Sequence, residues 1–163
     1  MKIAVLADIH ANYPALLAVL DHLERWQPDR VIVAGDIVNR GPRPVEVLRL
    51  IRRKQNEEGW LILKGNHEDY VLFHDQPDAP HNGPLFEIYR YSHWTYRRLQ
   101  DQIAYLRALP DEISEQTAGG EVRAVHASMR GNRSGIYPEM TDRLIARLIR
   151  PAPALMLVGH THR

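Results

Sequence analysis

The chain has 163 residues, enough for one ordinary domain with a hydrophobic core. It contains no cysteine, which excludes disulfide bonds and thiolate metal sites and leaves His, Asp, Glu and Asn as metal ligands. The 21 Lys and Arg residues balance the 20 Asp and Glu residues, so charge indicates neither a nucleic-acid nor a membrane partner. No apolar run approaches bilayer length, and residues 3–7 are too few for a signal peptide. We therefore predict a cytoplasmic protein.

Five short apolar segments have the composition of buried strands. They cover residues 3–7, 31–34, 61–63, 122–125 and 155–158. Amphipathic segments with a helical period lie between most of them, which is typical of βαβ units. The sequence therefore predicts an α/β fold with a largely parallel central sheet flanked by helices.

The first helices carry start and stop signals. One is expected to begin near Asn12, a capping residue type, with Pro14 in its first turn. A second is expected over residues 44–57, ending before Gly59, and a third is expected to begin near His67. Their apolar faces should pack on the sheet: Leu16, Leu20 and Leu23 in the first helix, and Val47, Leu48 and Ile51 in the second.

Residues 75–84 (DQPDAPHNGP) are rich in turn-forming residues and are predicted to form an exposed loop. An aromatic helix is expected over residues 86–107, which makes residues 75–107 a helical cap inserted into a single domain of residues 1–163. Residues 89–98 (YRYSHWTYRR) interleave aromatic and basic side chains. We prefer a helix that buries its aromatic side and hydrates its basic side, with a nucleobase-stacking surface as the alternative.

The last third of the chain predicts a hairpin and one more helix. Gly119 and Gly120 are expected to turn the chain between strands at residues 113–117 and 121–126. A helix is expected over residues 138–149 before the final strand. Its apolar side chains Leu144, Ile145 and Leu148 should point inward.

Each of the five apolar segments ends at residues that can bind a metal ion. In chain order these are Asp8 with His10, Asp36, Asn66 with His67, His126, and His160 with His162. Ligands of an open α/β sheet bind outside the carboxyl ends of its strands, so these side chains are expected to converge. The alternative is that these are unrelated polar residues that cap strands and helices. That alternative can explain one such ending, but it explains five of them poorly.

The composition of this set predicts two metal ions. Asp8 and His10 are two residues apart, as are His160 and His162, so each pair can reach a cation from one side of an extended chain. Carboxylate, amide and imidazole ligands together favour manganese, with iron, zinc, nickel or cobalt as alternatives. Six or seven ligands exceed the needs of one tetrahedral ion. They suit two divalent ions about 3.5–4 Å apart that share a carboxylate.

The order of these motifs resembles the calcineurin-like metallophosphoesterase superfamily. The matching segments are Asp8-x-His10, Gly35-Asp36, Gly65-Asn66-His67-Glu68, His126 and Gly159-His160-Thr161-His162, which together span nearly the whole chain. Residues 35–41 (GDIVNRG) are similar to the motif of the protein-phosphatase and diadenosine-tetraphosphatase branch, and the opening segment is closer to small bacterial members. The resemblance implies a β-sandwich core whose last strands are missing from this chain.

The resemblance also implies roles for individual residues. One ion would be held by Asp8, His10 and His162, and the other by Asn66, His126 and His160, with Asp36 bridging the two. A hydroxide between the ions would attack phosphorus. His67 would then protonate the leaving group, while Arg40 would bind the phosphate.

Two residues depart from the pattern of that branch. Asn39 replaces an Asp, so it can accept a hydrogen bond from the catalytic His but supplies no charge. Lys64 replaces an Arg and loses the bidentate fork for phosphate oxygens. Arg130 and Arg133, in the loop after His126, are further candidates for phosphate contact, and a solvated surface role is the alternative for all the basic residues named here. Glu68 is interpreted as a helix-dipole partner.

The predicted function is therefore dinuclear-metal-dependent hydrolysis of a phosphate ester. Three classes of substrate are candidates: a phosphorylated small molecule, a nucleotide and a phosphoprotein. No membrane partner is expected. The alternative is an inactive scaffold of the same fold, which the complete ligand set argues against. Because family members have further strands, we also expect self-association through an uncovered C-terminal sheet edge.

Overall fold

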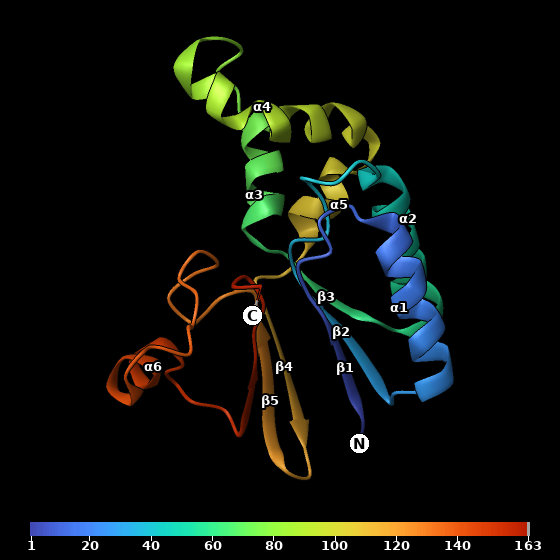
Figure 1. Cartoon of the computed structure of the whole chain (residues 1–163), viewed down its shortest axis with the longest axis vertical. Helices are drawn as coiled ribbons and strands as arrows, with labels where there is room; N and C mark the ends of the chain where they lie inside the picture. The colour runs from blue at the N-terminus through green and yellow to red at the C-terminus, as the bar shows by residue number, and fades with distance from the viewer. Residues whose placement is uncertain (163) are drawn as a thin grey trace.

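Six strands form two three-stranded sheets in the computed structural model, which describes residues 1–162 (Figure 1). The first sheet has the order β1-β2-β3 and is entirely parallel, with Val5 opposite Ile32 and Ile32 opposite Leu61. Its strands are β1 (Ile3–Leu6), β2 (Arg30–Ala34) and β3 (Leu61–Leu63). The predicted parallel central sheet is thus confirmed for the first three strands.

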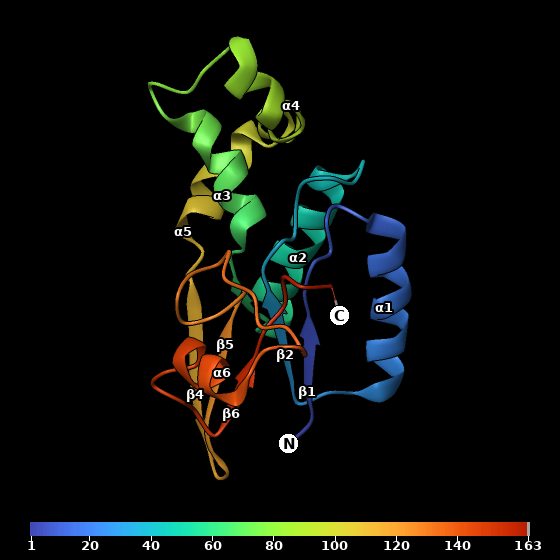
Figure 2. The ribbon, with the colours of Figure 1, turned by 60° about the vertical axis from the view of Figure 1, so that its left-hand side comes forward.

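The two helices that follow β1 and β2 cover one face of this sheet (Figure 2). The first, α1 (Tyr13–Trp26), is capped by Asn12, whose Oδ1 accepts from the Ala15 amide at 3.2 Å. The second, α2 (Pro44–Glu58), ends at Gly59, where φ is +69° and a glycine avoids strain. The predicted boundaries are confirmed, and the buried side chains include Leu16, Leu23, Val47, Leu48 and Ile51.

The second sheet packs against the other face of the first. It contains β4 (Glu112–Thr117), β5 (Gly120–Val125) and β6 (Leu155–Leu157), with β4 antiparallel and β6 parallel to β5. Ile32, Leu63 and Ala124 form a buried cluster between the two sheets. The predicted strands are therefore divided between two layers of a sandwich. The antiparallel β4 aside, their carboxyl ends point to a common end of the molecule.

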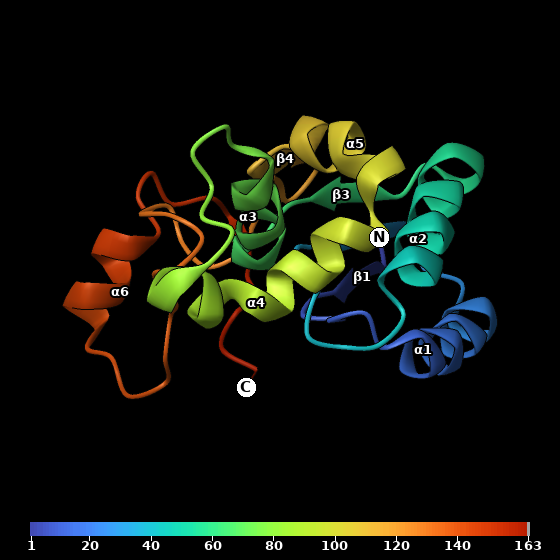
Figure 3. The same ribbon diagram turned by 90° about the horizontal axis from the view of Figure 1, so that it is seen from above.

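We use the word cap for the helical region between β3 and β4, residues 66–108, which is wider than the predicted insertion of residues 75–107. It is built from several helices, so the single helix predicted over residues 86–107 is wrong. Its elements are α3 (Asn66–Leu72), η1 (Phe73–Asp75), α4 (Gly83–Arg98), η2 (Gln100–Gln102) and α5 (Ile103–Ala108). The chain breaks at Leu99, which is fully buried, and the turn lets Ile103 and Leu106 enter the same core. Burial of three apolar side chains outweighs continuing one helix. Figure 3 shows α4 crossing above α3.

The helix predicted over residues 138–149 begins later, as α6 (Asp142–Leu148), after the cap residue Thr141. No residue of α6 is buried, and Leu144 is 40% exposed, so its predicted inward orientation is wrong. Figure 1 shows α6 at the periphery, away from α1 to α5, where no other helix covers it. Within residues 1–162, no helix is long and apolar enough to cross a membrane.

Candidate metal centre and active site

The loops that leave β1, β2, β5 and β6 are hydrogen-bonded to one another at the site. The backbone N–H of His10 donates to the carbonyl of Asp36 at 2.9 Å, and that of Gly159 donates to the carbonyl of His126 at 2.8 Å. The His160 amide donates to Asp8 Oδ2, also at 2.9 Å. These bonds join loops far apart in sequence and fix the predicted ligands within one small volume.

Left-handed backbone conformations are concentrated in the same loops. Among residues 1–162, nine non-glycine residues have positive φ. All except Gln27, a helix C-cap, lie in these loops: Asp8, His10, Ala11, Asp36, Asn39, Arg40, His160 and His162. Such conformations cost about 1–3 kcal/mol each and persist where the surroundings impose them. Their clustering is an observation independent of residue type, and it makes this end of the molecule the candidate functional site.

Glycine permits the close approach of two of these loops. A Cβ on Gly35 would lie 2.6 Å from the Gly65 nitrogen and 2.8 Å from His126 Nδ1, and the φ of Gly35 is +85°. A Cβ on Gly65 would collide with the Asp36 carboxylate. Both positions therefore exclude a side chain, because the loops after β2 and β3 must touch to bring Asp36 beside Asn66.

Three groups of potential ligands share side chains. Each group offers one atom per residue, and these atoms lie within 4.8 Å of one another: Asp8, His10 and His162; His10, Asp36 and His67; and Asp36, His126 and His160. His10 and Asp36 each belong to two groups, and the middle group, which contains both, links the outer two. Its Oδ2 lies 3.7 Å from His10 Nε2 and 3.3 Å from His126 Nε2, while its Oδ1 accepts from the His67 amide at 2.9 Å. One carboxylate oxygen therefore faces both halves of the cluster.

The side chains present fit metal ions. His126 Nδ1 donates to the Ala34 carbonyl at 2.8 Å, so Nε2 of the neutral ring carries a lone pair. That lone pair faces Asn66 Oδ1 at 3.0 Å and the Asp36 carboxylate, which brings three acceptors together. Burial lowers the pKa of His126, but Asp36 raises it overall, so this point attracts positive charge.

The other half of the cluster shows the same need for a cation. Asp8 Oδ1 is buried and makes no hydrogen bond within residues 1–162. His10 Nε2 and His162 Nε2 lie 3.2 Å apart, and Asp8 Oδ1 is 3.3 Å from the latter. A buried acceptor left without a donor costs free energy, and a divalent ion held by Asp8, His10 and His162 would remove that cost.

His67 lies beside the cluster and is 2% exposed. Arg40 Nε donates to His67 Nε2 at 3.1 Å, while the Asn39 Nδ2 position lies 3.0 Å from His67 Nδ1. Burial lowers the pKa of His67 to about 4, and the positive charges of neighbouring His10 and Arg40 act in the same direction against Asp36. The ring is therefore neutral here near pH 7 and carries one proton, on either Nδ1 or Nε2.

The hydrogen bonds around His67 decide where that proton lies. Because Arg40 donates to Nε2, the proton of the neutral ring is on Nδ1. Nδ1 then requires an acceptor, which a half-turn of the Asn39 amide supplies by exchanging its oxygen and nitrogen. In that orientation the amide nitrogen donates to Thr95 Oγ1, 3.0 Å from the other end of the amide, and the Thr95 hydroxyl donates to the Tyr91 carbonyl at 3.4 Å. Every group in this chain of contacts is then satisfied.

Glu68 has a larger structural role than the helix-dipole interaction predicted for it. It is fully buried, and its two carboxylate oxygens accept four backbone N–H bonds, from Asp36, Ile37, Val38 and Gly65, at 2.7 to 3.1 Å. Burial and the nearby Asp36 carboxylate raise its pKa to about 7, although these hydrogen bonds oppose the rise. Glu68 thereby fixes the loop that carries Asp36 and Asn39. The only sequence feature that singled out Glu68 was its position in the Gly65–Glu68 motif.

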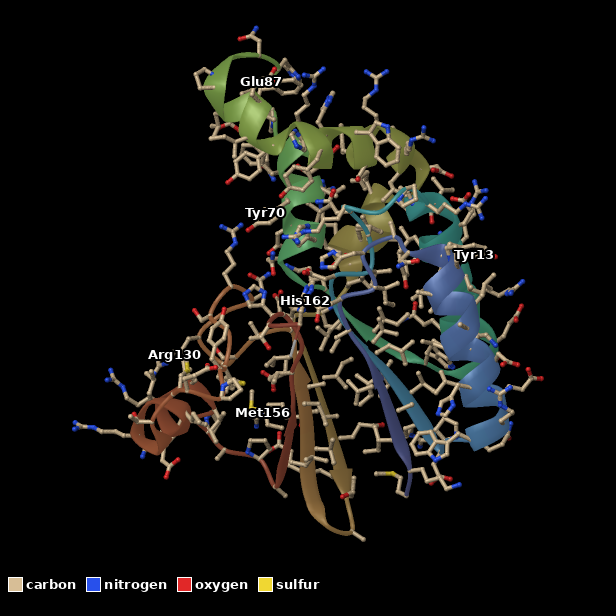
Figure 4. The ribbon with its side chains drawn as sticks, in the orientation of Figure 1. Tyr13, Tyr70, Glu87, Arg130, Met156 and His162 are labelled. Atoms are coloured by element: carbon tan, nitrogen blue, oxygen red, sulfur yellow. The ribbon has the colours of Figure 1, made fainter. Side chains whose placement is uncertain are left out.

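The basic residues predicted to contact phosphate have different positions. Arg40 lies at the site, on His67. Lys64 is held by Asp69 at 2.8 Å and Asp111 at 2.9 Å, which raise its pKa despite burial, so its charge is already neutralised. Arg130 lies beside α6, where its Nε donates to the Arg147 carbonyl at 3.3 Å, rather than beside His162 (Figure 4). The structure thus brings only Arg40 of these three to the cluster.

Aromatic side chains from the cap form a wall next to His67. The Tyr70 ring lies 5.1 Å from the His67 ring, edge to face, and the Tyr91 ring lies 6.2 Å away. Arg133 also stacks on Tyr70, with 4.7 Å from its guanidinium carbon to the ring centroid. Neither Tyr70 nor Thr95 was predicted as part of the site, because a lone Tyr or Thr in a helix carries no sequence signal for it.

Comparison with known proteins agrees with this geometry. A family model described as "Calcineurin-like phosphoesterase" matches residues 1–163. The structure of a metallophosphoesterase from Sphaerobacter thermophilus superposes with a TM-score of 0.71 and 32% identity, covering 99% of this chain and 60% of that chain. The predicted fold class is thereby confirmed.

Two curated relatives are similar in sequence. An uncharacterized protein of Methanocaldococcus jannaschii is 30% identical over 164 residues, which cover 98% of this chain and 62% of that protein. A symmetrical bis(5'-nucleosyl)-tetraphosphatase of Methylobacillus flagellatus is 29% identical over 132 residues, covering 71% of this chain and 47% of that protein. The chain thus spans less than two thirds of the length of these relatives. Its family is nevertheless shown by the match along its whole length: the chain belongs to the calcineurin-like phosphoesterase family.

Proposed function

We propose that this chain hydrolyses phosphate esters at a centre of two divalent metal ions, with manganese favoured by the mixed ligand set. The observation that carries the proposal is the position of Asp36, whose Oδ2 faces ligands on both sides. The residues that would hold the first ion are Asp8, His10 and His162, and those for the second are Asn66, His126 and His160. When bound, such ions would activate water and neutralise charge on the phosphate.

The protein groups around the cluster have distinct tasks in this proposal. Arg40 would hold a phosphate oxygen and stabilise the charge that develops there. His67 Nε2 faces the same space, so it would give its proton to the departing oxygen. The negative charge of a bound phosphate ester would lie close to His67 and thereby favour its cationic form. Tyr70 and Tyr91 would keep water away from this proton transfer.

The substrate is a proposal at the level of class. The name of the Methylobacillus flagellatus relative points to dinucleoside polyphosphates for that protein, and we carry a nucleotide to this chain as one candidate beside a phosphorylated small molecule and a phosphoprotein. The second hypothesis is that the chain is an inactive scaffold of the same fold. It is disfavoured because all seven positions hold coordinating side chains and His67 is positioned by Asn39 and Arg40.

The test is metal analysis combined with a substrate panel. We expect two equivalents of Mn²⁺ per chain, and Mn²⁺-dependent hydrolysis of 4-nitrophenyl phosphate, bis(4-nitrophenyl) phosphate, or both. A panel without any turnover in protein that holds two ions would favour the scaffold. Hydrolysis that survives complete removal of metal by a chelator would contradict the dinuclear centre.

Replacing Asn39 with Asp should change the pH dependence of the reaction. The carboxylate would accept from His67 Nδ1 in place of the amide oxygen and would add a negative charge about 3 Å away, as judged from the present contact. An adjacent opposite charge raises a histidine pKa by roughly 1–3 units. Because His67 acts in its protonated form, the loss of activity at rising pH should move to higher pH by at least about one unit. The rate against pH measures this shift, and an unchanged profile would show that residue 39 does not govern the acid.

A further inference from the structure

A cleft of about 650 Å³ opens beside the candidate active site, between the cap and the loop after β5. Its wall includes Tyr70, Phe73, Leu85, Tyr89, Arg107 and Arg133. Figure 4 shows Tyr70 on the side of α3 that faces this loop. The volume is within the range of about 300–1,000 Å³ that is usual for small-molecule sites.

Tyr70 connects this cleft to the reaction centre. Its ring contacts His67, with 5.1 Å between the ring centroids, and also contacts the Arg133 guanidinium. Tyr89 continues the aromatic wall, 5.7 Å from Tyr70 and 5.4 Å from Phe73. The cleft therefore begins at a side chain that contacts His67.

The two arginines of the cleft differ in their charge partners. Arg107 is paired with Asp75, which also accepts from the Tyr96 hydroxyl. Arg133 has no carboxylate partner and no hydrogen bond within residues 1–162, although Asp69 lines the same cleft and is held instead by Lys64 and Asn132. The guanidinium of Arg133 is thus available to a ligand.

We propose that this cleft binds the leaving group of the substrate and that the leaving group carries a planar aromatic ring, as a nucleoside does. Tyr89 offers a ring face for stacking, and the Arg133 guanidinium, which lies over the Tyr70 ring at 4.7 Å, offers a flat cation that can stack on a base. An aliphatic alcohol would leave these rings uncovered. The proposal rests on the proposed function for the identity of the bond that is broken.

The chemical step balances with the groups named. Water adds its oxygen to phosphorus, the bond between phosphorus and the nucleoside oxygen breaks, and the proton of His67 passes to that oxygen. The proton released by the attacking water restores the acid through solvent. The products are a phosphate in the metal centre and a free nucleoside hydroxyl in the cleft.

The matched ligands for the test are adenosine and ribose, which share the sugar and differ at its anomeric carbon, where adenosine carries the base. Calorimetry on the Mn²⁺-loaded protein should show adenosine binding about 5- to 150-fold more tightly than ribose, the range that base–aromatic stacking contributes. In the hydrolysis assay, adenosine should also inhibit at correspondingly lower concentration than ribose. The binding measurement does not require turnover, so its result is separate from that of the proposed function.

Two variants locate the effect. Tyr89→Leu and Arg133→Gln should each reduce the preference for adenosine by about tenfold and leave ribose binding unchanged. Arg133→Gln alters an exposed residue and should not affect folding. The matched control is Trp94→Leu, because Trp94 is an aromatic residue of the same helix, α4, that does not line the cleft. It is exposed and has Arg98 stacked on its ring at 4.3 Å. Equal affinity for adenosine and ribose, or an undiminished preference in both cleft variants, would overturn the inference.

Discussion

Replacing Asp36 with Asn should lower both the metal content and the rate of hydrolysis more than any other single isosteric change at the site. Asp36 is 2% exposed and is shared by two of the three ligand groups. The amide keeps the shape and can still accept from the His67 N–H, but it presents a neutral NH₂ group where Oδ2 faces both His10 and His126. Loss of several kcal/mol of charge stabilisation corresponds to a rate about 10³-fold lower.

Asn66→Ala provides the comparison for this prediction, because Asn66 contacts only the half of the cluster that contains His126 and His160. It should release about one ion per chain, whereas Asp36→Asn should weaken both. Asp101→Asn, on the exposed side of the cap, controls for the loss of a carboxylate. Elemental analysis, with circular dichroism to check folding, gives the result. Fully active protein with a single ion per chain would refute the shared-carboxylate centre.

The ends of the strands were predictable from the sequence because local chemistry determines them. A short apolar run that finishes at Asp36 or His126 can be recognised from composition and topology without knowing which sheet the strand joins. The helix start at Asn12 and the helix end at Gly59 follow from capping and φ preferences in the same way. These signals act within a few residues, so tertiary contacts do not alter them.

The parts that could not be predicted depend on contacts between distant residues. The cap helix breaks at Leu99 because that side chain is buried with Ile103 and Leu106, which periodicity along the chain does not reveal. Leu144 is exposed because no element covers α6, although its sequence has the pattern of an inward-facing residue. Lys64 forms an ion pair with Asp111, which lies 47 residues later in the sequence, and this pair neutralises the charge of Lys64. The assignment of residues 1–163 to one domain and self-association through a sheet edge stay predictions.

The site shows the same division between local and distant information. The seven candidate ligands were predicted because each is a metal-binding residue type at a strand end. The roles of Glu68 and Thr95 were missed because both residues act by positioning other residues. Glu68 accepts hydrogen bonds from the loop that carries Asp36, and Thr95 contacts the amide of Asn39, 56 residues away in the sequence. Positioning residues of this kind become visible only when the partner loop is in place.

His67→Ala should affect substrates according to their leaving groups. An alkoxide needs a proton as it departs, whereas 4-nitrophenolate leaves without one, so hydrolysis of an alkyl phosphate should fall by about 10²–10⁴-fold and that of 4-nitrophenyl phosphate far less. Metal content should stay near wild type, because the six histidine, asparagine and aspartate ligands assigned to the two ions, and Asp36 between them, are unchanged. The measurement is kcat/KM for both esters in both proteins, with metal analysis of the same samples.

Arg40→Gln is the matched comparison. Arg40 contacts His67 Nε2 at 3.1 Å and would hold the phosphate common to both esters, so its loss should slow the two reactions equally. Equal losses for the two esters in His67→Ala would mean that His67 positions the phosphate, as Arg40 does, and that water or another group supplies the proton.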